Sequence, residues 1–456
     1  MRPLTIQEVV SATGGRYCGE ERLLLSTISK VVADSRMVSP GTLFVPIIGE
    51  RVDAHDFIPA AFQAGAACVF SQRTLDCDKP YILVDSTLMA LQRLAAWYKG
   101  QFSPRVIGIT GSVGKTTMKE MLFSALSQEF CVFKSQGNLN SQVGLPLTLF
   151  ELGPEHQLAI LEMGTSSFGE IDRLARLGQP DDCLFINIGN VHLEFLGSRQ
   201  GVFQAKTEML SHMRPGGHVF VNGDDDLLLG LKRSREDVIT FGLEKHNDVL
   251  ATQVRSLGLS GMAFTAVWDG GTCEITVPVP GDHMVYPALG ALAVSLAYGM
   301  APDAIRTGIA EYRPIWGRMN IQDLGEIMLI NDAYNASPSS MRAALDVLGY
   351  HTGRKVAILG DMYELGEDTE RYHREVGAYA REKGIDLILC VGGLTQGMAQ
   401  TAKGRHYEGK AELWAQLPGL LQPGDAVLIK GSRGLEMEEI VQKLQNLYGW
   451  HETQTH

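Results

Sequence analysis

The sequence predicts an α/β protein of three domains built on mostly parallel sheets. Segments typical of a strand, a turn and a helix alternate along most of the chain, which is the pattern of parallel strands covered by crossover helices. The 456 residues suggest roughly three domains at about 150 residues each. Hydrophobic residues make up 45% and charged residues 20% of the chain, and this composition excludes disordered, collagen-like and disulfide-scaffold proteins.

The first, small α/β domain is expected over residues 1–100. Its short alternating segments lead to a longer helix that ends at Gly100, before Pro104, and this sets the first boundary. The expected elements are a strand at Leu43–Ile47, a helix at Ala54–Gly65, a strand at Ala66–Phe70 and a helix at Ser86–Lys99.

The second domain is expected over residues 101–313, because Arg313-Pro314 interrupts the pattern again. Asp269-Gly270-Gly271 predicts a turn between short hairpin strands. The uncharged stretch from Met284 to Pro302 contains proline and glycine and is interpreted as a buried core helix rather than a membrane span. The other expected elements are strands at Arg105–Thr110, Leu158–Met163, Cys183–Ile188 and His218–Gly223 and a helix from Thr116 to about Gln128.

The third domain, residues 314–456, repeats the alternation of strand and helix. Strands are expected at IMLIND, KVAILGD, LILCVGG and AVLIKG, and a last helix at Glu436–Leu447. Ser337-Pro338 is a favourable helix start.

The net charge and the cysteines indicate which ligands and which cellular compartment to expect. The net charge of −12 argues against a nucleic-acid-binding surface, but phosphorylated ligands stay possible because local backbone amides hold them. The seven scattered cysteines contain no CxxC pair, so reduced thiols are expected. MRPLTIQEVV lacks the apolar core of a signal peptide. We therefore expect a cytoplasmic protein without a membrane partner.

The strongest local motif lies between an expected strand and helix. Glycines there let backbone amides approach phosphate oxygens, and the helix N-terminus adds partial positive charge. A lysine can then reach the outer phosphates and a threonine hydroxyl can bind magnesium. A chance glycine turn is the alternative, since Ile109 stands where the strict motif has its first glycine. The motif residues are Gly111, Ser112, Val113, Gly114, Lys115, Thr116 and Thr117.

Polar residues follow several expected strands, where ligands of open α/β sheets bind. Glu162 could face magnesium or be a solvated acid, and His192 could ligate a metal or form a hydrogen bond in its loop. Asp332 could accept hydrogen bonds from ribose hydroxyls or stand at a helix entry, and Asn138 and Asn140 could bind a ligand or cap a turn.

Lys206 is expected on the apolar side of a helix over Gly201–Met213. It lies three or four residues from Val202, Phe203, Met209 and Leu210. A charged lysine there is costly without a partner. The side chain could reach the surface, pair with an acid, or become neutral and take up carbon dioxide as a carbamate.

The motifs together resemble a known family. In chain order the sequence contains TGSVGKTT, NLNSQVGLP, LEMG, the His192 segment, the lysine of AKTE, and GRMN. These resemble the Mur ligases, which form amide bonds in peptidoglycan precursors with ATP. Three further segments resemble the member that adds D-alanyl-D-alanine to UDP-N-acetylmuramoyl-tripeptide: DSRMVSPGTLFVPIIGERVDAHDFIPAA, NDAYNASPSSM and LGDMYELGE.

The resemblance implies a fold, a reaction and a set of functional residues. The first domain would bind the uridine diphosphate end of the substrate, a central P-loop-type domain would bind ATP, and a Rossmann-like third domain would complete the site. ATP would convert the terminal carboxylate into an acyl phosphate, which the amine of D-alanyl-D-alanine attacks, with Mg²⁺ as the metal. The implied roles are Lys115 and Thr116 on ATP phosphates and magnesium, Glu162 on magnesium, His192 and carbamylated Lys206 on a second metal, Arg318, Asp332 and His283 on the nucleotide, and Ser35, Arg36 and Asn138 on the UDP substrate.

Two departures from the family pattern concern nucleotide and substrate contacts. Met284 and Pro287 stand where the family commonly has asparagines near adenine, so the sequence leaves the adenine contacts of this segment open, although His283 matches. Ser141 replaces the second asparagine of an NxNN pattern.

Two alternative functions stay open at this point. One is the neighbouring Mur ligase that adds the third amino acid, and the other is a nucleotide switch without ligase activity. The sequence does not distinguish lysine from diaminopimelate as the third peptide residue. A monomer is expected.

Overall fold

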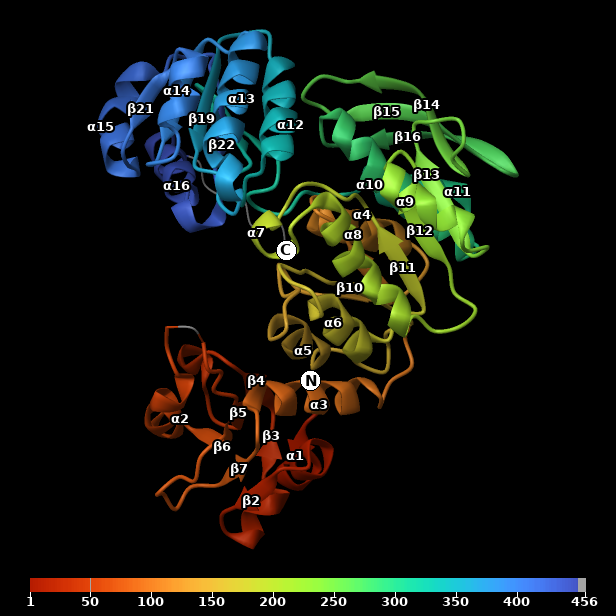
Figure 1. The fold of residues 1–456 in the computed structure, drawn as a ribbon, viewed down its shortest axis with the longest axis vertical. Helices are drawn as coiled ribbons and strands as arrows, with labels where there is room; N and C mark the ends of the chain where they lie inside the picture. The colour runs from red at the N-terminus through yellow and green to blue at the C-terminus, as the bar shows by residue number, and fades with distance from the viewer. Residues whose placement is uncertain (50, 450–456) are drawn as a thin grey trace. The chain divides into compact units, whose positions relative to one another are not determined.

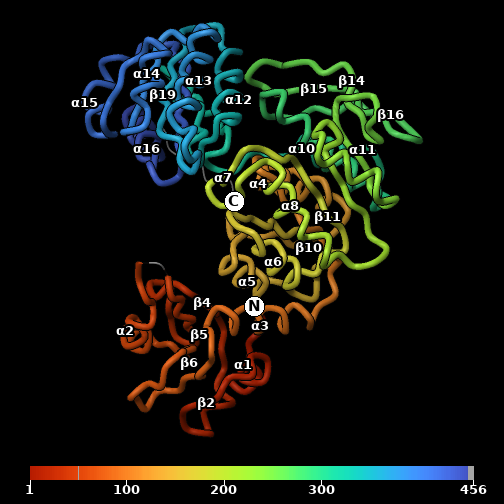
Figure 2. Tube along the Cα trace, viewed as in Figure 1, coloured from red at the N-terminus to blue at the C-terminus, as the bar shows by residue number. Residues whose placement is uncertain are grey.

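The computed structural model describes residues 1–49 and 51–449 (Figures 1 and 2). Its contacts divide the chain into two compact units. One contains residues 1–110, 130–184 and 205–219, and the other contains residues 111–129, 185–204 and those from 220 onwards. The strands of the described residues form sheets of two, five, nine and six strands.

The five-stranded sheet lies in the first unit and has the order β2-β7-β6-β5-β4. Its strands β4 to β7 are parallel, and β2 is antiparallel to β7. Phe44 and Val69 are buried in its core with Ile58 of the adjoining helix. The elements of this segment are β1 (Leu4–Thr5), α1 (Ile6–Thr13), β2 (Arg16–Cys18), β3 (Thr27–Ile28), β4 (Lys30–Val32), β5 (Thr42–Phe44), α2 (Ile58–Gln63), β6 (Ala66–Ser71), β7 (Tyr81–Leu83) and α3 (Thr87–Lys99).

Two expected elements of this segment are shorter than the sequence pattern suggested. The strand expected at Leu43–Ile47 ends at Phe44, two residues before Pro46, which cannot donate to a sheet. The helix expected at Ala54–Gly65 divides into a 3₁₀ turn at Ala54–Phe57 and α2. The helix expected at Ser86–Lys99 is confirmed as α3, with the Ser86 side chain accepting a hydrogen bond from the Met89 amide.

The nine-stranded sheet has the order β16-β15-β14-β13-β12-β11-β8-β10-β9. Strands β9, β10 and β8 are parallel, and β14 to β16 form antiparallel pairs with a turn at Asp269-Gly270. The strands are β8 (Arg105–Thr110), β9 (Val132–Lys134), β10 (Leu158–Glu162), β11 (Asp182–Phe185), β12 (Val219–Asn222), β13 (Val238–Gly242), β14 (Val249–Ser256), β15 (Met262–Trp268) and β16 (Gly271–Val277).

The helices of this region begin with α4, which packs against α10 and α11. They are α4 (Lys115–Leu126), α5 (Gly144–Leu149), α6 (Glu170–Gly178), α7 (Leu193–Leu196), α8 (Arg199–Thr207), α9 (Asp226–Leu229), α10 (Val285–Ala297) and α11 (Pro302–Ala310). Helix α10 carries no charge and is buried along most of its length, which confirms the expected core helix. Across residues 1–49 and 51–449, no helix is both long and apolar enough to cross a membrane.

The six-stranded sheet has the order β17-β18-β22-β19-β20-β21 and is parallel except for β17. Buried residues such as Ile358, Leu389, Val427 and Ile429 form its core, and helices α12 to α16 flank it (Figure 1). Its elements are β17 (Asn320–Asp323), β18 (Met328–Asn331), α12 (Pro338–Gly349), β19 (Lys355–Gly360), α13 (Thr369–Glu382), β20 (Leu387–Val391), α14 (Gln396–Ala402), β21 (Arg405–Tyr407), α15 (Lys410–Leu420), β22 (Ala426–Lys430) and α16 (Glu438–Leu447).

Candidate active site

The phosphate-binding loop connects β8 to α4 as the sequence predicts. Gly114 has φ of +82°, a left-handed conformation that disfavours any residue with a side chain. A Cβ atom at Gly111 would lie 2.9 Å from the Ile186 side chain, so this position also requires glycine. The loop therefore ends at the positive end of the α4 dipole, where anions are stabilised.

Asn187 fixes the shape of this loop. Its Oδ1 accepts hydrogen bonds from the Ser112 and Val113 amides, both at 3.0 Å, and its Nδ2 donates to the Val113 carbonyl at 3.1 Å. The Gly189 amide donates to the Ser112 hydroxyl at 2.8 Å. Asn187 is not predicted from the sequence, because nothing in the CLFINIGN segment shows that its side chain returns to a loop 74 residues earlier.

Lys115 and Thr116 occupy the first turn of α4. The Lys115 ammonium donates to the Gly111 carbonyl at 2.8 Å, so the lysine bends back over the loop. Thr116 is buried, and its Oγ1 accepts a hydrogen bond from Arg318 Nη2 at 3.3 Å. The hydroxyl of the motif thus meets a cation from the segment that precedes β17.

Arg318 is held in place by an aromatic ring. Its guanidinium lies 4.1 Å from the centre of the Tyr334 ring, a favourable cation–π arrangement. Its Nε is buried and has no hydrogen-bond partner in the part of the chain that the structure describes. A buried donor of this kind is suited to an anionic ligand.

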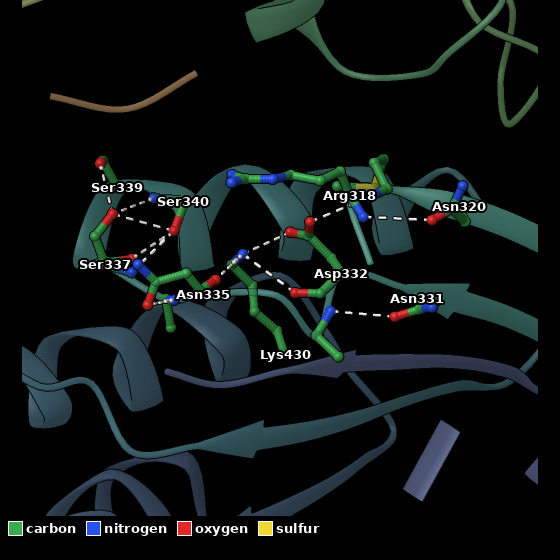
Figure 3. Close-up of polar contacts among 12 residues, drawn as sticks. Arg318, Asn320, Asn331, Asp332, Asn335, Ser337, Ser339, Ser340 and Lys430 are labelled. Carbon is green, nitrogen blue, oxygen red and sulfur yellow. Dashed lines mark hydrogen bonds and ion pairs between the residues drawn. The ribbon is translucent and has the colours of Figure 1, made fainter. Parts of the chain in front are cut away.

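Asp332 follows β18, at the carboxyl end of the six-stranded sheet. Its Oδ1 accepts a hydrogen bond from the Met319 amide at 3.1 Å, and its Oδ2 accepts one from the Lys430 ammonium at 2.6 Å (Figure 3). The helix start expected at Ser337-Pro338 is confirmed, since Ser337 and Ser340 form a capping box before α12.

His283 belongs to the 3₁₀ turn that precedes α10. Gly281 has φ of +109°, and a Cβ atom there would lie 2.5 Å from the His283 ring. Burial lowers the pKa of the His283 imidazole, and the nearby Asp332 carboxylate opposes this shift in part. Met284 and Pro287 are buried among core residues, and neither side chain offers a hydrogen-bond donor for adenine.

Glu162 is the last residue of β10 and is only 1% exposed. In the sheet register it lies opposite Ile109 of β8, the strand that leads into the phosphate loop. Asn140 Nδ2 donates to Glu162 Oε1 at 2.6 Å, and the Asn140 carbonyl accepts from the Gly164 amide. Asn140 is therefore the asparagine that orients Glu162, whereas Asn138 is exposed.

Lys206 is buried on α8, with 1% of its surface exposed. The apolar residues Val202, Ala205 and Met209 around it are also buried. Helical periodicity thus placed Lys206 correctly on the buried face of α8. The alternative prediction, that its side chain reaches the surface, is wrong. The helix expected over Gly201–Met213 ends at Thr207 and continues as a 3₁₀ turn.

His192 precedes α7 and contacts a loop after β19. His192 has φ of +51° and Glu364 has φ of +63°, both in the left-handed region. The His192 Nδ1 lies 2.8 Å from Glu364 Oε2, and this contact with His192 lowers the pKa of Glu364. A carboxylate beside Nδ1 is the arrangement in which histidines commonly coordinate a metal through Nε2. Glu364 lies in LGDMYELGE, but its contact with His192 could not be foreseen.

Ser35 and Arg36 form a 3₁₀ turn after β4. The Arg36 guanidinium lies 2.7 Å from Asp34 Oδ2 and is 87% exposed. Hydrogen bonds from the side chain and the amide of Arg36 lower the pKa of Asp34 to about 2. The turn therefore presents a cation to solvent.

The donor set suits magnesium better than a transition metal. Across residues 1–49 and 51–449, no three His, Cys, Asp or Glu residues cluster as a complete metal site. Magnesium keeps several waters and commonly takes one or two protein oxygens together with substrate phosphates. The Glu162 carboxylate and the Thr116 hydroxyl are each an oxygen donor of this kind.

Family models cover most of the chain. The Mur ligase family catalytic domain matches residues 27–99, the Mur ligase middle domain residues 109–295, and the Mur ligase glutamate ligase domain residues 317–433. The chain belongs to the Mur ligase family. The family resemblance and the α/β fold class predicted from the sequence are thereby confirmed.

Curated Mur ligases resemble this chain over nearly its whole length. The UDP-N-acetylmuramoyl-tripeptide–D-alanyl-D-alanine ligase of Bacillus subtilis is 38% identical, over 92% of this chain and 93% of that protein. The ligase of the same name from Escherichia coli is 36% identical, over 98% of this chain and 99% of that protein.

Solved Mur ligases share the fold. A crystal structure of MurF from Acinetobacter baumannii has a TM-score of 0.90 and 32% identity, covering 98% of this chain and 99% of the other. MurF from Thermotoga maritima in complex with ADP has a TM-score of 0.81 and 28% identity, covering 92% and 98%. A diaminopimelate-adding ligase, with a TM-score of 0.54 and 17% identity, shares the fold alone.

Proposed function

We propose that this protein is the ATP-dependent ligase that joins D-alanyl-D-alanine to the terminal carboxylate of UDP-N-acetylmuramoyl-tripeptide. The observation that carries this function is the identity of 36–38% to ligases of that name over more than nine tenths of each chain. The phosphate loop before α4 and the pair of Arg318 and Asp332 supply the nucleotide-binding features that such a reaction needs.

The chemistry begins from a poor electrophile. A carboxylate resists attack by an amine, so it is first converted into an acyl phosphate, from which phosphate leaves when the amine attacks. When bound, ATP and Mg²⁺ supply the phosphoryl group and the positive charge that offsets its negative oxygens. The residues of this chain bind, orient and neutralise charge around that transfer.

Lys115, Arg318 and the α4 N-terminus are proposed to hold the nucleotide phosphates. Lys115 already contacts a loop carbonyl, and an incoming phosphate would compete for its ammonium. Arg318 Nη2 donates a hydrogen bond to the Thr116 hydroxyl, and its buried Nε has no hydrogen-bond partner among the described residues. Asp332 and His283 are proposed to contact the nucleoside.

Thr116 and Glu162 are proposed as ligands of one magnesium ion, and His192 and carbamylated Lys206 as ligands of a second. The buried carboxylate of Glu162 and its hydrogen bond from Asn140 support the first assignment. The burial of Lys206 supports the second, since burial favours the neutral amine that carbon dioxide can carbamylate.

We propose the domain roles that the resemblance implies. Residues 1–100 would bind the UDP substrate through Ser35 and Arg36, with Asn138 nearby, and the exposed Arg36 cation suits a diphosphate. Residues 101–313 would bind ATP, and residues 314–456 would complete the nucleotide site. We also propose a cytoplasmic location, which the free cysteines of the described chain support, and a monomeric state.

An assay of amine acceptors tests the proposed function. Purified protein with ATP, Mg²⁺ and UDP-N-acetylmuramoyl-tripeptide should release phosphate with D-alanyl-D-alanine and not with free lysine or diaminopimelate. Comparing tripeptides that end in lysine and in diaminopimelate identifies the third residue. Release with lysine or diaminopimelate and the corresponding dipeptide substrate would indicate the neighbouring ligase, and release without any acceptor would indicate a nucleotide switch.

A further inference from the structure

Lys430 is a buried cation that the reaction scheme above does not use. It is the last residue of β22, and only 3% of its side chain is exposed. Strand β22 lies between β18 and β19, with Asn331 opposite Ile429 and Leu359 opposite Lys430. The parallel register therefore places Lys430 level with Asp332, at the end of the sheet where ligands bind.

The Lys430 ammonium joins two parts of the loop between β18 and α12. It donates to Asp332 Oδ2 at 2.6 Å and to the Asn335 carbonyl at 2.8 Å (Figure 3). The Asp332 amide in turn donates to the Ile429 carbonyl at 3.0 Å. Asp332 is thus fixed to β22 by both its backbone and its side chain.

The Asp332 carboxylate keeps acceptor positions for a ligand. Its Oδ1 accepts the Met319 amide and its Oδ2 accepts Lys430, whereas an ionised carboxylate has about four acceptor positions. About 14% of the side chain is exposed. A carboxylate held in this way can accept one hydrogen bond on each oxygen from a vicinal diol.

Besides holding Asp332 in place, the Lys430 ammonium offsets its negative charge. Asp332 is a carboxylate near residues proposed to hold nucleotide phosphates, so an unpaired negative charge there would repel the ligand. The Lys430 ammonium offsets this charge without using an exposed side chain. A neutral residue of the same size would leave the Asp332 carboxylate held by the Met319 amide alone and would leave its charge uncompensated.

We propose that Lys430 is a positioning residue, which holds Asp332 so that its carboxylate binds the ribose hydroxyls of the nucleotide. This inference rests on the proposed function, because it takes ATP as the ligand of Asp332. Lys430 itself need not touch the nucleotide. It sets the preference for a ribose over a sugar that lacks hydroxyls.

The test compares ADP with 2′,3′-dideoxyADP by isothermal titration calorimetry in the presence of Mg²⁺. A charge-assisted hydrogen-bond pair predicts that the native protein binds ADP about 10- to 100-fold more tightly. In Lys430→Met this ratio should fall to within about threefold, whereas Lys430→Arg, which keeps the charge, should retain part of it. Lys443→Met, which removes a surface ion pair with Glu439 on α16, is the matched control and should keep the native ratio.

Lys430→Gln serves if the methionine variant does not fold, because it keeps a donor for the Asn335 carbonyl while removing the charge. A folded neutral variant with the native ratio would overturn the proposal, and so would a native protein that binds both nucleotides equally. Product formation by the native protein is measured in parallel. Its absence would reject the proposed function, whereas its presence with an unchanged ratio in the variant would reject only the role of Lys430.

Discussion

Replacing Asn187 with alanine should disable the phosphate loop without unfolding the protein. The substitution removes three hydrogen bonds, two from the Ser112 and Val113 amides and one to the Val113 carbonyl. At about 1 kcal/mol for each net hydrogen bond, the ordered loop loses about 3 kcal/mol. Since each 1.4 kcal/mol is a factor of ten, kcat/KM for ATP should fall on the order of 100-fold.

The effect on global stability should be much smaller than the effect on catalysis. Because the loop can open locally while the apolar core of the domain stays packed, only part of this loss reaches the whole protein, and we expect the melting temperature to fall by only about 2–4 °C, which corresponds to about 1 kcal/mol in a domain of this size. The assay is phosphate release at varied ATP with both other substrates saturating. Asn446→Ala, at an exposed position of α16, is the control. A change in kcat/KM below threefold for a folded Asn187→Ala protein would refute the role of this side chain.

Four further substitutions test the site and the fold. Lys115→Ala should lower kcat by several orders of magnitude with the fold intact, because it removes charge from the transferring phosphate; near-native turnover in the phosphate assay would reject its role. Lys206→Ala should lose activity and recover part of it with acetate, and carbon-13 NMR with labelled bicarbonate should show a carbamate signal only in the native protein; an active variant and no native signal would exclude the carbamate. Arg318→Lys should raise KM for ATP about tenfold or more, because a lysine cannot stack and donate to Thr116 as the guanidinium does; an unchanged KM would contradict this. Burial, and to a smaller extent Arg214, lowers the pKa of Lys99 from 10.5 to about 8, so the unfolded chain binds more protons between these values and stability should rise with pH there. Lys99→Met should accordingly stabilise the protein at pH 7 by at most about 3 kcal/mol, a gain that fades as the pH rises from about 8 to 10.5; equal gains in denaturant melts at pH 7 and pH 10.5 would contradict the shift.

The sequence predicted the fold best where the residues of a single segment determine its local structure. The order of β8, the glycine loop and α4 follows from the spacing of apolar residues and from Gly114, whose φ requires glycine. Helical periodicity placed Lys206 on the apolar side of its helix but left open whether the side chain reaches the surface, and the structure buries it. Strand β11 is the opposite case. The apolar run predicted it as far as Ile188, but it ends at Phe185, and the chain beyond it supplies Asn187 to the phosphate loop.

Parts of the candidate site depend on contacts between distant segments, which a single sequence does not record. Lys430 lies 98 residues from Asp332 along the chain, and only the register of β18 with β22 brings them together. The contact of His192 with Glu364 likewise depends on how two loops meet. Asn140 was considered beside Asn138, but nothing in GNLNSQVGLP indicated which asparagine reaches Glu162.

The most direct test of the ligase assignment follows one oxygen atom. UDP-N-acetylmuramoyl-tripeptide labelled with oxygen-18 in its terminal carboxylate is incubated with the protein, ATP, Mg²⁺ and D-alanyl-D-alanine, and mass spectrometry then measures the label in the released phosphate and the mass of the peptide product. An acyl phosphate passes one carboxylate oxygen to phosphate when the amine attacks, so each phosphate released should carry one labelled oxygen, with one pentapeptide product formed. Unlabelled phosphate, or phosphate formed without the pentapeptide product, would contradict the assignment.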